Sequence, residues 1–115
     1  MLAQRRAALE AVAPELFAME SAIDAALLQS ARLTASLIDQ RIKAGLSAVV
    51  GQDALERSGA TFSTLLAARR EIVATHAELG ELKKRIGLGA VMVGGSGDKP
   101  DSAVAAARAN IQAVA

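Results

Sequence analysis

Two long segments of the sequence carry apolar residues at the spacing of an α-helix, and glycine lies between them. In residues 14–50 one broad face contains Leu16, Met19, Ile23, Leu27, Thr34, Ile38, Ile42, Leu46 and Val49. In residues 53–86 the matching face contains Leu55, Phe62, Leu65, Leu66, Ile72, Val73, Leu79 and Ile86. Residues three and four apart share one side of a helix, so the pattern predicts two long amphipathic helices. Because the connection is short, we expect them to fold back as an antiparallel hairpin.

Proline and glycine set the expected boundaries of the first helix. Pro14 fits the first turn of a helix, where its missing N–H is not needed. Residues 1–13 are therefore expected to form a short amphipathic helix or a helical extension, since Pro14 inside a continuous helix would force a kink. Gly45 offers an early end to the long helix, but Gly51 is the better candidate because the apolar face continues to Val49.

The second helix and the tail have their own signals. Asp53 and Glu56 have the spacing of a capping box at the start of the second helix. Residues 87–100 are rich in glycine and predict a loop. Residues 101–115 predict a short C-terminal helix. All of these segments are expected to belong to one domain, since the chain has 115 residues.

The composition favours helices and a thin core. Hydrophobic residues make up 52% of the chain, but 27 residues are alanine, which buries little area. Phe17 and Phe62 are the only aromatic residues. Strands favour aromatic and β-branched residues, so this composition predicts an all-α protein.

Charge and cysteine content exclude several classes of function. The net charge of +1 gives no electrostatic footprint for nucleic acid. The absence of cysteine excludes disulfides and thiolate metal sites. The longest uncharged run, residues 86–97, is too short to span a bilayer, and no secretory signal is visible. We therefore expect a cytoplasmic protein that binds neither membrane nor nucleic acid.

The first helix has more apolar surface than one partner helix can cover. The surplus predicts either docking of the terminal helices of the same chain or a second copy that completes a four-helix bundle, and we favour the second copy. The residues expected at this apolar interface are Leu16, Ile23, Leu27, Ile38, Phe62, Leu65, Ile72 and Leu79.

Polar residues interrupt the apolar faces at regular places. Arg69, His76 and Lys83 are seven residues apart and follow Leu55 and Phe62 in the same heptad position. On the first helix, Glu20 and Asp24, which are four residues apart, also fall inside the apolar arc. Such groups set register and partner choice more than they add stability. A different possibility is that the basic series meets an acidic partner helix or a small anion.

The two sets of charges can be paired if the hairpin folds about Gly51. That fold predicts three neighbourhoods between the helices: Glu20 near Lys83, Asp24 near His76 or Leu79, and Thr34 near Arg69.

His76 is the only histidine and lies in the run Ala-Thr-His-Ala-Glu-Leu-Gly, residues 74–80. This run resembles the motif of histidine phosphotransfer domains, with Gly80 four residues after the histidine. It departs from the motif at Leu79, where lysine is expected. The resemblance implies that His76 would be the phosphoacceptor.

The favoured interpretation is a non-enzymatic interaction or assembly protein without cofactor or metal. It would self-associate as a homodimer or clasp a partner helix, with Glu20, Asp24, Arg69, His76 and Lys83 setting register. The alternatives are a histidine phosphotransfer module acting through His76 and a small-molecule binder with a pocket between helices.

Overall fold

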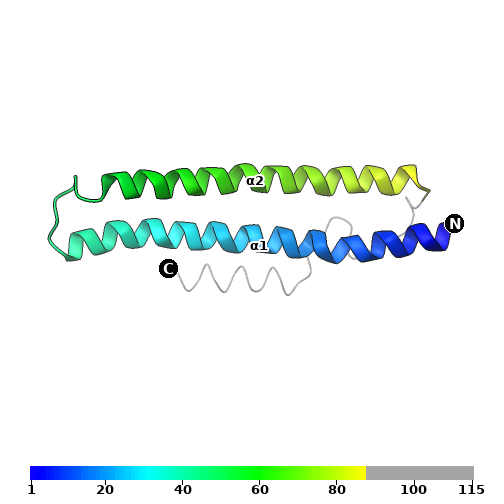
Figure 1. Ribbon diagram of the computed structural model, residues 1–115, viewed down its shortest axis with the longest axis horizontal. Coiled ribbons are helices and arrows are strands. Elements are labelled where there is room, and N and C mark those ends of the chain that lie inside the picture. Colours follow the sequence, from blue (N-terminus) through cyan, green and yellow to red (C-terminus); the bar gives the residue numbers. More distant parts are fainter. Residues whose placement is uncertain (88–115) are drawn as a thin grey trace.

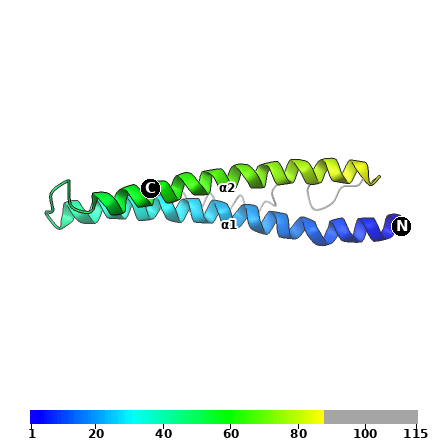
Figure 2. The ribbon, with the colours of Figure 1, turned by 45° about the horizontal axis from the view of Figure 1, so that its top comes forward.

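The computed structural model describes residues 1–87, which form two long α-helices (Figure 1). α1 spans Leu2–Lys43 and α2 spans Gln52–Arg85, and the described residues contain no strand. The helices run antiparallel and side by side in both views (Figure 1, Figure 2). The longest extent of 66 Å matches the 42 residues of α1 at a rise of about 1.5 Å each. The predicted all-α hairpin is confirmed.

α1 is one continuous helix from Leu2, so the prediction that Pro14 starts a new helix is wrong. Pro14 lies inside α1, where its missing N–H leaves the carbonyl of Glu10 without its helical partner. Arg5 Nη1 donates a hydrogen bond of 3.0 Å to the carbonyl oxygen of Ile86, at the end of α2. The first turns of α1 are thus joined to α2 instead of forming a separate extension.

α1 ends at Lys43, earlier than the apolar pattern predicts. Gly45 has a φ of 68°, and its N–H donates to the carbonyl of Ile42 at 3.0 Å. The N–H of Leu46 donates to the carbonyl of Arg41 at 3.1 Å. These two bonds form a Schellman motif, which closes a helix with glycine in the left-handed conformation.

Gly51 begins α2 instead of ending α1. It is the N-cap residue, with a φ of 80° and no side-chain cap bond, so the predicted capping box does not form. Asp53 lies in the first turn, where its charge suits the positive end of the helix dipole. The prediction that α1 continues to Gly51 relied on Leu46 and Val49, and both side chains are exposed. They therefore add too little packing to lengthen the helix.

Substitution by alanine is expected to have opposite effects at Gly51, in the connection, and at Gly59, inside α2. Gly51→Ala should lower the free energy of unfolding by about 1 kcal/mol, because alanine strains at positive φ. Gly59→Ala is the matched control inside α2, where an added Cβ meets nothing within 4 Å. It should raise stability by about 0.5–1 kcal/mol. Urea unfolding followed by circular dichroism measures both. Equal stability of Gly51→Ala and the unchanged protein would contradict this account of the connection.

The side chains between the helices follow one repeat, which we call the seam. Buried or half-buried residues recur at alternating intervals of three and four, the spacing used by paired helices. On α1 they are Leu9, Ala13, Leu16, Glu20, Ile23, Leu27, Ser30, Thr34, Leu37 and Arg41. On α2 they are Leu55, Ser58, Phe62, Leu65, Ile72, His76, Leu79, Lys83 and Ile86, and the more exposed Arg69 takes the remaining position.

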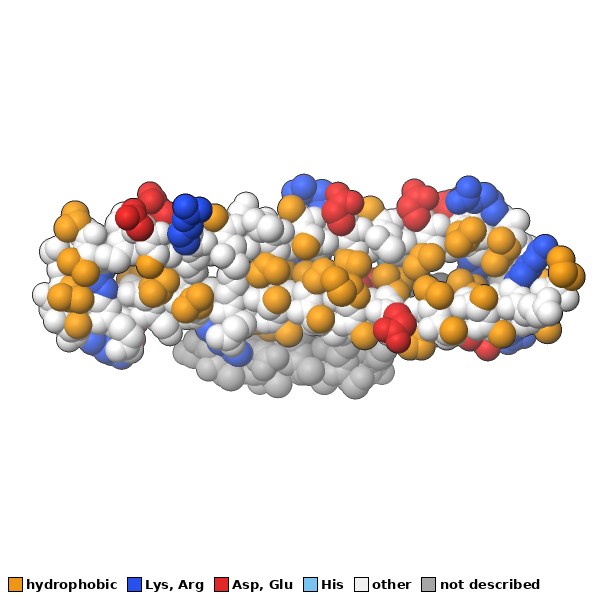
Figure 3. Space-filling model, viewed as in Figure 1, with side chains coloured by type: hydrophobic (Ala, Val, Ile, Leu, Met, Phe, Trp, Pro, Cys, Tyr) orange, Lys and Arg blue, Asp and Glu red, His pale blue; other side chains and the backbone are white. Residues whose placement is uncertain are grey.

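The seam forms only a thin core. Among the described residues, Ile23 is the one buried hydrophobic side chain, at 5% exposure. Hydrophobic side chains also reach the surface along the junction of the two helices (Figure 3). The predicted glycine-rich loop and C-terminal helix lie outside the described residues, apart from Gly87.

Candidate functional site

A partly buried polar contact of the seam joins Glu20 of α1 to His76 of α2. His76 Nδ1 lies 2.8 Å from Glu20 Oε1. The Glu20 side chain is 10% exposed and that of His76 is 28% exposed. A carboxylate can only accept, so Nδ1 is the donor and Nε2 is left for another role. The ring of Phe17 meets the imidazole edge-on, with centroids 6.2 Å apart. The imidazole is therefore held in one orientation.

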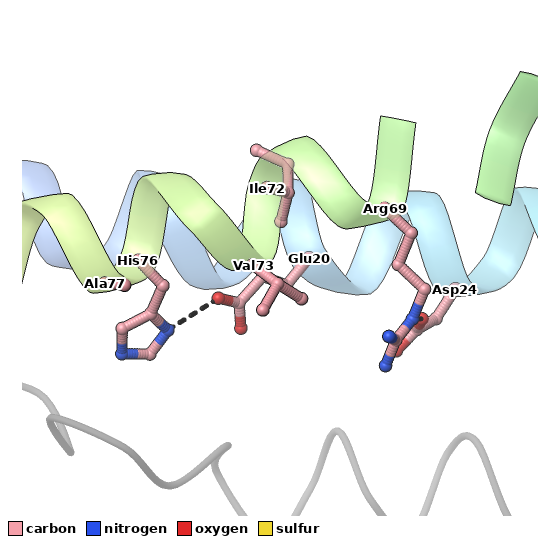
Figure 4. Close-up of a pocket in the computed structure, with 7 residues that line it drawn as sticks. All are labelled: Glu20, Asp24, Arg69, Ile72, Val73, His76 and Ala77. Carbon is pink, nitrogen blue, oxygen red and sulfur yellow. Dashed lines mark hydrogen bonds and ion pairs between the residues drawn. The ribbon is translucent and has the colours of Figure 1, made fainter. Parts of the chain in front are cut away.

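A second pair lies about two turns earlier along α2, toward the connection. Arg69 Nε donates to Asp24 Oδ1 at 3.1 Å, and both side chains are partly exposed. Together the two pairs border a groove of about 360 Å³ between the helices (Figure 4). The rest of its wall is apolar and comes from Ile72, Val73 and Ala77. The groove thus combines two fixed polar pairs with an apolar wall.

A third polar contact is made by hydroxyl groups nearer the connection. Thr34 Oγ1 donates to the carbonyl of Ser30 at 3.0 Å and lies 2.6 Å from Ser58 Oγ. Because the Thr34 proton is already used, Ser58 is the donor to Thr34. The Ser30 hydroxyl is buried and has no hydrogen-bond partner among the described residues. This layer therefore contains both a satisfied pair and an unsatisfied group.

Ser30→Ala tests the unsatisfied hydroxyl. A buried hydroxyl without a partner costs about 1–3 kcal/mol of desolvation, so its removal should leave stability unchanged or raise it by about 1 kcal/mol. Thr34→Val is the comparison, because it leaves Ser58 without its acceptor and should lower stability by about 1–3 kcal/mol. Thermal unfolding of both variants measures the difference. A loss of stability in Ser30→Ala would show that its hydroxyl has a partner.

The predicted pairing of charges between the helices is wrong in register. Glu20 meets His76 instead of Lys83, Asp24 meets Arg69 instead of His76 or Leu79, and Thr34 meets Ser58 instead of Arg69. The error comes from the end of α1. Since α1 stops at Lys43, the turn of the hairpin moves toward the N-terminus. Every residue of α1 then faces a part of α2 about two to three helical turns earlier than predicted.

The basic series divides into paired and buried members. Arg69 and His76 are paired with acids of α1, so each has an acidic partner within the hairpin. Lys83 is 9% exposed and borders a smaller cavity of about 70 Å³ near the N-terminal part of α1. The structure brings Glu20, Asp24, Arg69 and His76 together at one groove and places Lys83 outside it.

The predicted apolar interface residues lie on the seam, with one exception. Leu16, Ile23, Leu27, Phe62, Leu65, Ile72 and Leu79 are buried or half-buried there. Ile38 is exposed, and Leu37 occupies the corresponding seam position. These residues hold α1 against α2.

A further apolar surface runs along α1 beside the seam, and the sequence analysis did not single it out. It consists of Val12, Met19, Ala26 and Leu33, which we call the α1 stripe. The three large side chains are 43%, 48% and 51% exposed, respectively, and Ala26 is half-buried. Its signal in the sequence is the constant interval of seven residues.

The described residues contain neither a metal-binding cluster nor a membrane-spanning helix. Within residues 1–87 no group of histidine, aspartate and glutamate side chains is arranged to hold a metal ion. Neither described helix has a stretch both long and apolar enough to cross a lipid bilayer. Comparison with protein-family models, with curated proteins and with solved structures finds no match.

Proposed function

We propose that this chain is a non-enzymatic assembly protein whose hairpin binds further helices, with a second copy of itself as the main partner. The observation that carries the proposal is the α1 stripe, an apolar line left exposed next to the seam. Burial of one Val, Leu or Met side chain stabilises by about 1.5–3 kcal/mol relative to exposure. The stripe therefore represents several kcal/mol of association energy that the described hairpin does not use.

The thin core supports the same proposal. Long helices gain most of their stability from tertiary packing of an apolar face, and Ile23 is the only large apolar side chain buried within the described hairpin. Two hairpins packed as a four-helix bundle would bury the exposed apolar surface between them. Assembly would thus complete the core.

The polar seam contributes selectivity in this proposal. Glu20 and Asp24 lie on α1, whereas their partners His76 and Arg69 lie on α2. A shift in register would separate the charges and leave Glu20 buried without a partner. The pairs therefore favour one alignment of α1 on α2, and that alignment fixes which apolar residues face outward.

Sedimentation velocity over a range of protein concentrations tests the proposal. The unchanged protein should be a dimer, and Met19→Glu together with Leu33→Glu should shift it to monomer while helical content is retained. Val49→Glu is the control, because Val49 is exposed on the connection and should not alter the dimer. A monomer at every concentration would overturn self-association.

A second candidate function is histidine phosphotransfer, and the Glu20–His76 contact favours it. Glu20 accepts a hydrogen bond from Nδ1, so in the neutral imidazole the lone pair would be on Nε2. Attack of Nε2 on the phosphorus of an aspartyl phosphate would form an N–P bond, break the P–O bond and return the aspartate carboxylate. Incubation with a phosphorylated receiver domain should then label His76, with no label in His76→Gln. An unlabelled protein would end this candidate.

A further inference from the structure

We infer that a second copy packs antiparallel across the α1 stripe, with the two-fold axis beside Ala22, midway between Met19 and Ala26. This inference rests on the proposed self-association and adds the surface and its orientation. An interval of seven residues returns to almost the same side of a helix. Val12, Met19, Ala26 and Leu33 therefore form one line, about 30 Å long at 1.5 Å per residue.

The stripe is complementary to itself when one copy is reversed. About a centre between Met19 and Ala26, Val12 faces Leu33 of the second copy, and Met19 faces Ala26 of the second copy. Each contact joins two apolar side chains, and the long Met19 meets the small Ala26. A C2 interface requires this property, because the same patch must serve both copies.

The neighbouring line of α1 agrees with the same axis. This line, also spaced by seven, contains Ala8, Glu15, Ala22, Gln29 and Ser36, all of which are exposed. In the antiparallel arrangement Ala22 lies at the axis and faces its own copy. Two small side chains at this point allow the helices to approach closely, since the distance between helix axes depends on the side chains at the contact.

Charge favours the antiparallel arrangement over the parallel one. In a parallel pair each residue meets itself, so Glu15 would face Glu15 and Arg5 would face Arg5 of the second copy. Reversal places Glu15 opposite Gln29 and Arg5 opposite Gln40 of the second copy. Like charges that face each other across an interface are destabilising, and their absence selects the reversed orientation.

Engineered cysteines test the orientation directly, because the chain has none of its own. Under mild oxidation, Ala22→Cys should form a disulfide-linked dimer, since both thiols lie at the axis. Val12→Cys alone should not cross-link, but a mixture of Val12→Cys and Leu33→Cys should give a mixed disulfide. Each expected link should form at least about tenfold faster than that of Val49→Cys, whose thiols meet only by collision. Circular dichroism and sedimentation of every variant confirm folding and dimerisation.

The possible outcomes separate this inference from the proposed function. A dimer in which Val12→Cys links to itself is parallel and overturns the orientation while self-association stands. A dimer in which Ala22→Cys stays unlinked uses another surface and also overturns the inference. If the chain is a monomer at every concentration, self-association and this inference fail together, whether residues 101–115 cover the stripe or a different helical protein binds it. Fast linking of Ala22→Cys with the mixed Val12–Leu33 disulfide supports both.

Discussion

His76→Ala is expected to lower the free energy of unfolding by about 3 kcal/mol, because it leaves the Glu20 carboxylate in the seam without its donor. Glu20 is only 10% exposed on its side chain, and His76 Nδ1 lies 2.8 Å from its oxygen. Urea unfolding at one fixed protein concentration, followed by circular dichroism, measures the loss, since assembly makes stability depend on concentration.

A double variant separates the cost of the unpaired charge from the value of the pair. Glu20→Leu with His76→Leu removes both polar groups and should recover most or all of the loss, because apolar pairs often replace buried ion pairs without penalty. Arg6→Ala is the control for an ordinary ion pair. Its link to Glu10 is exposed on both sides, so the change should be less than about 0.5 kcal/mol. Equal losses for His76→Ala and Arg6→Ala would contradict a buried contact at Glu20.

Ile23→Ala should be the most damaging truncation of an apolar side chain among residues 1–87, with a loss of about 2–5 kcal/mol. Ile23 is 5% exposed and lies at the centre of the seam on α1. Because the core is thin, few neighbours can move into the space left by the missing atoms. Thermal unfolding should show a clear fall in Tm with little change in the helical signal at low temperature.

Ile42→Ala provides a matched control for this truncation. It makes the same chemical change on the same helix, but Ile42 is 60% exposed near the end of α1. Its loss should remain within about 0.5 kcal/mol. A similar fall in Tm for both variants would contradict the seam as described, since it would mean that the buried Ile23 contributes no more to stability than the exposed Ile42.

The fold could be predicted from the sequence because its strongest signals are local. The helical spacing of apolar residues and the short connection are sufficient to predict an antiparallel hairpin, and α2 begins and ends within one residue of its predicted bounds. Pro14 misled the prediction at the other end. A helix can carry an internal proline at the cost of one hydrogen bond when packing holds it on both sides, and the bond from Arg5 to Ile86 provides such an anchor.

The partners within the site could not be predicted, because a small local choice controls them. The choice between Gly45 and Gly51 decides where α1 ends, and the sequence presents both as possible stops. The apolar pattern that continues to Val49 favoured Gly51, but the Val49 side chain is exposed and contributes little packing energy. The contacts of Glu20 and Asp24 with α2 depend on that boundary. Placing the end of α1 at Gly51 instead of Gly45 therefore gave both residues the wrong predicted partners.

The division of charge in the seam has a consequence for how copies can exchange segments. The acids Glu20 and Asp24 belong to α1, and the bases Arg69 and His76 belong to α2. Each pair would form equally well if α2 came from another molecule, so these contacts do not distinguish a closed hairpin from a domain-swapped dimer. That distinction depends on the connection, where Gly45 and Gly51 hold left-handed turns that reverse the chain. Two glycines, remote from the paired charges of Glu20, Asp24, Arg69 and His76, therefore decide whether the chain closes on itself or pairs with the α2 of its neighbour.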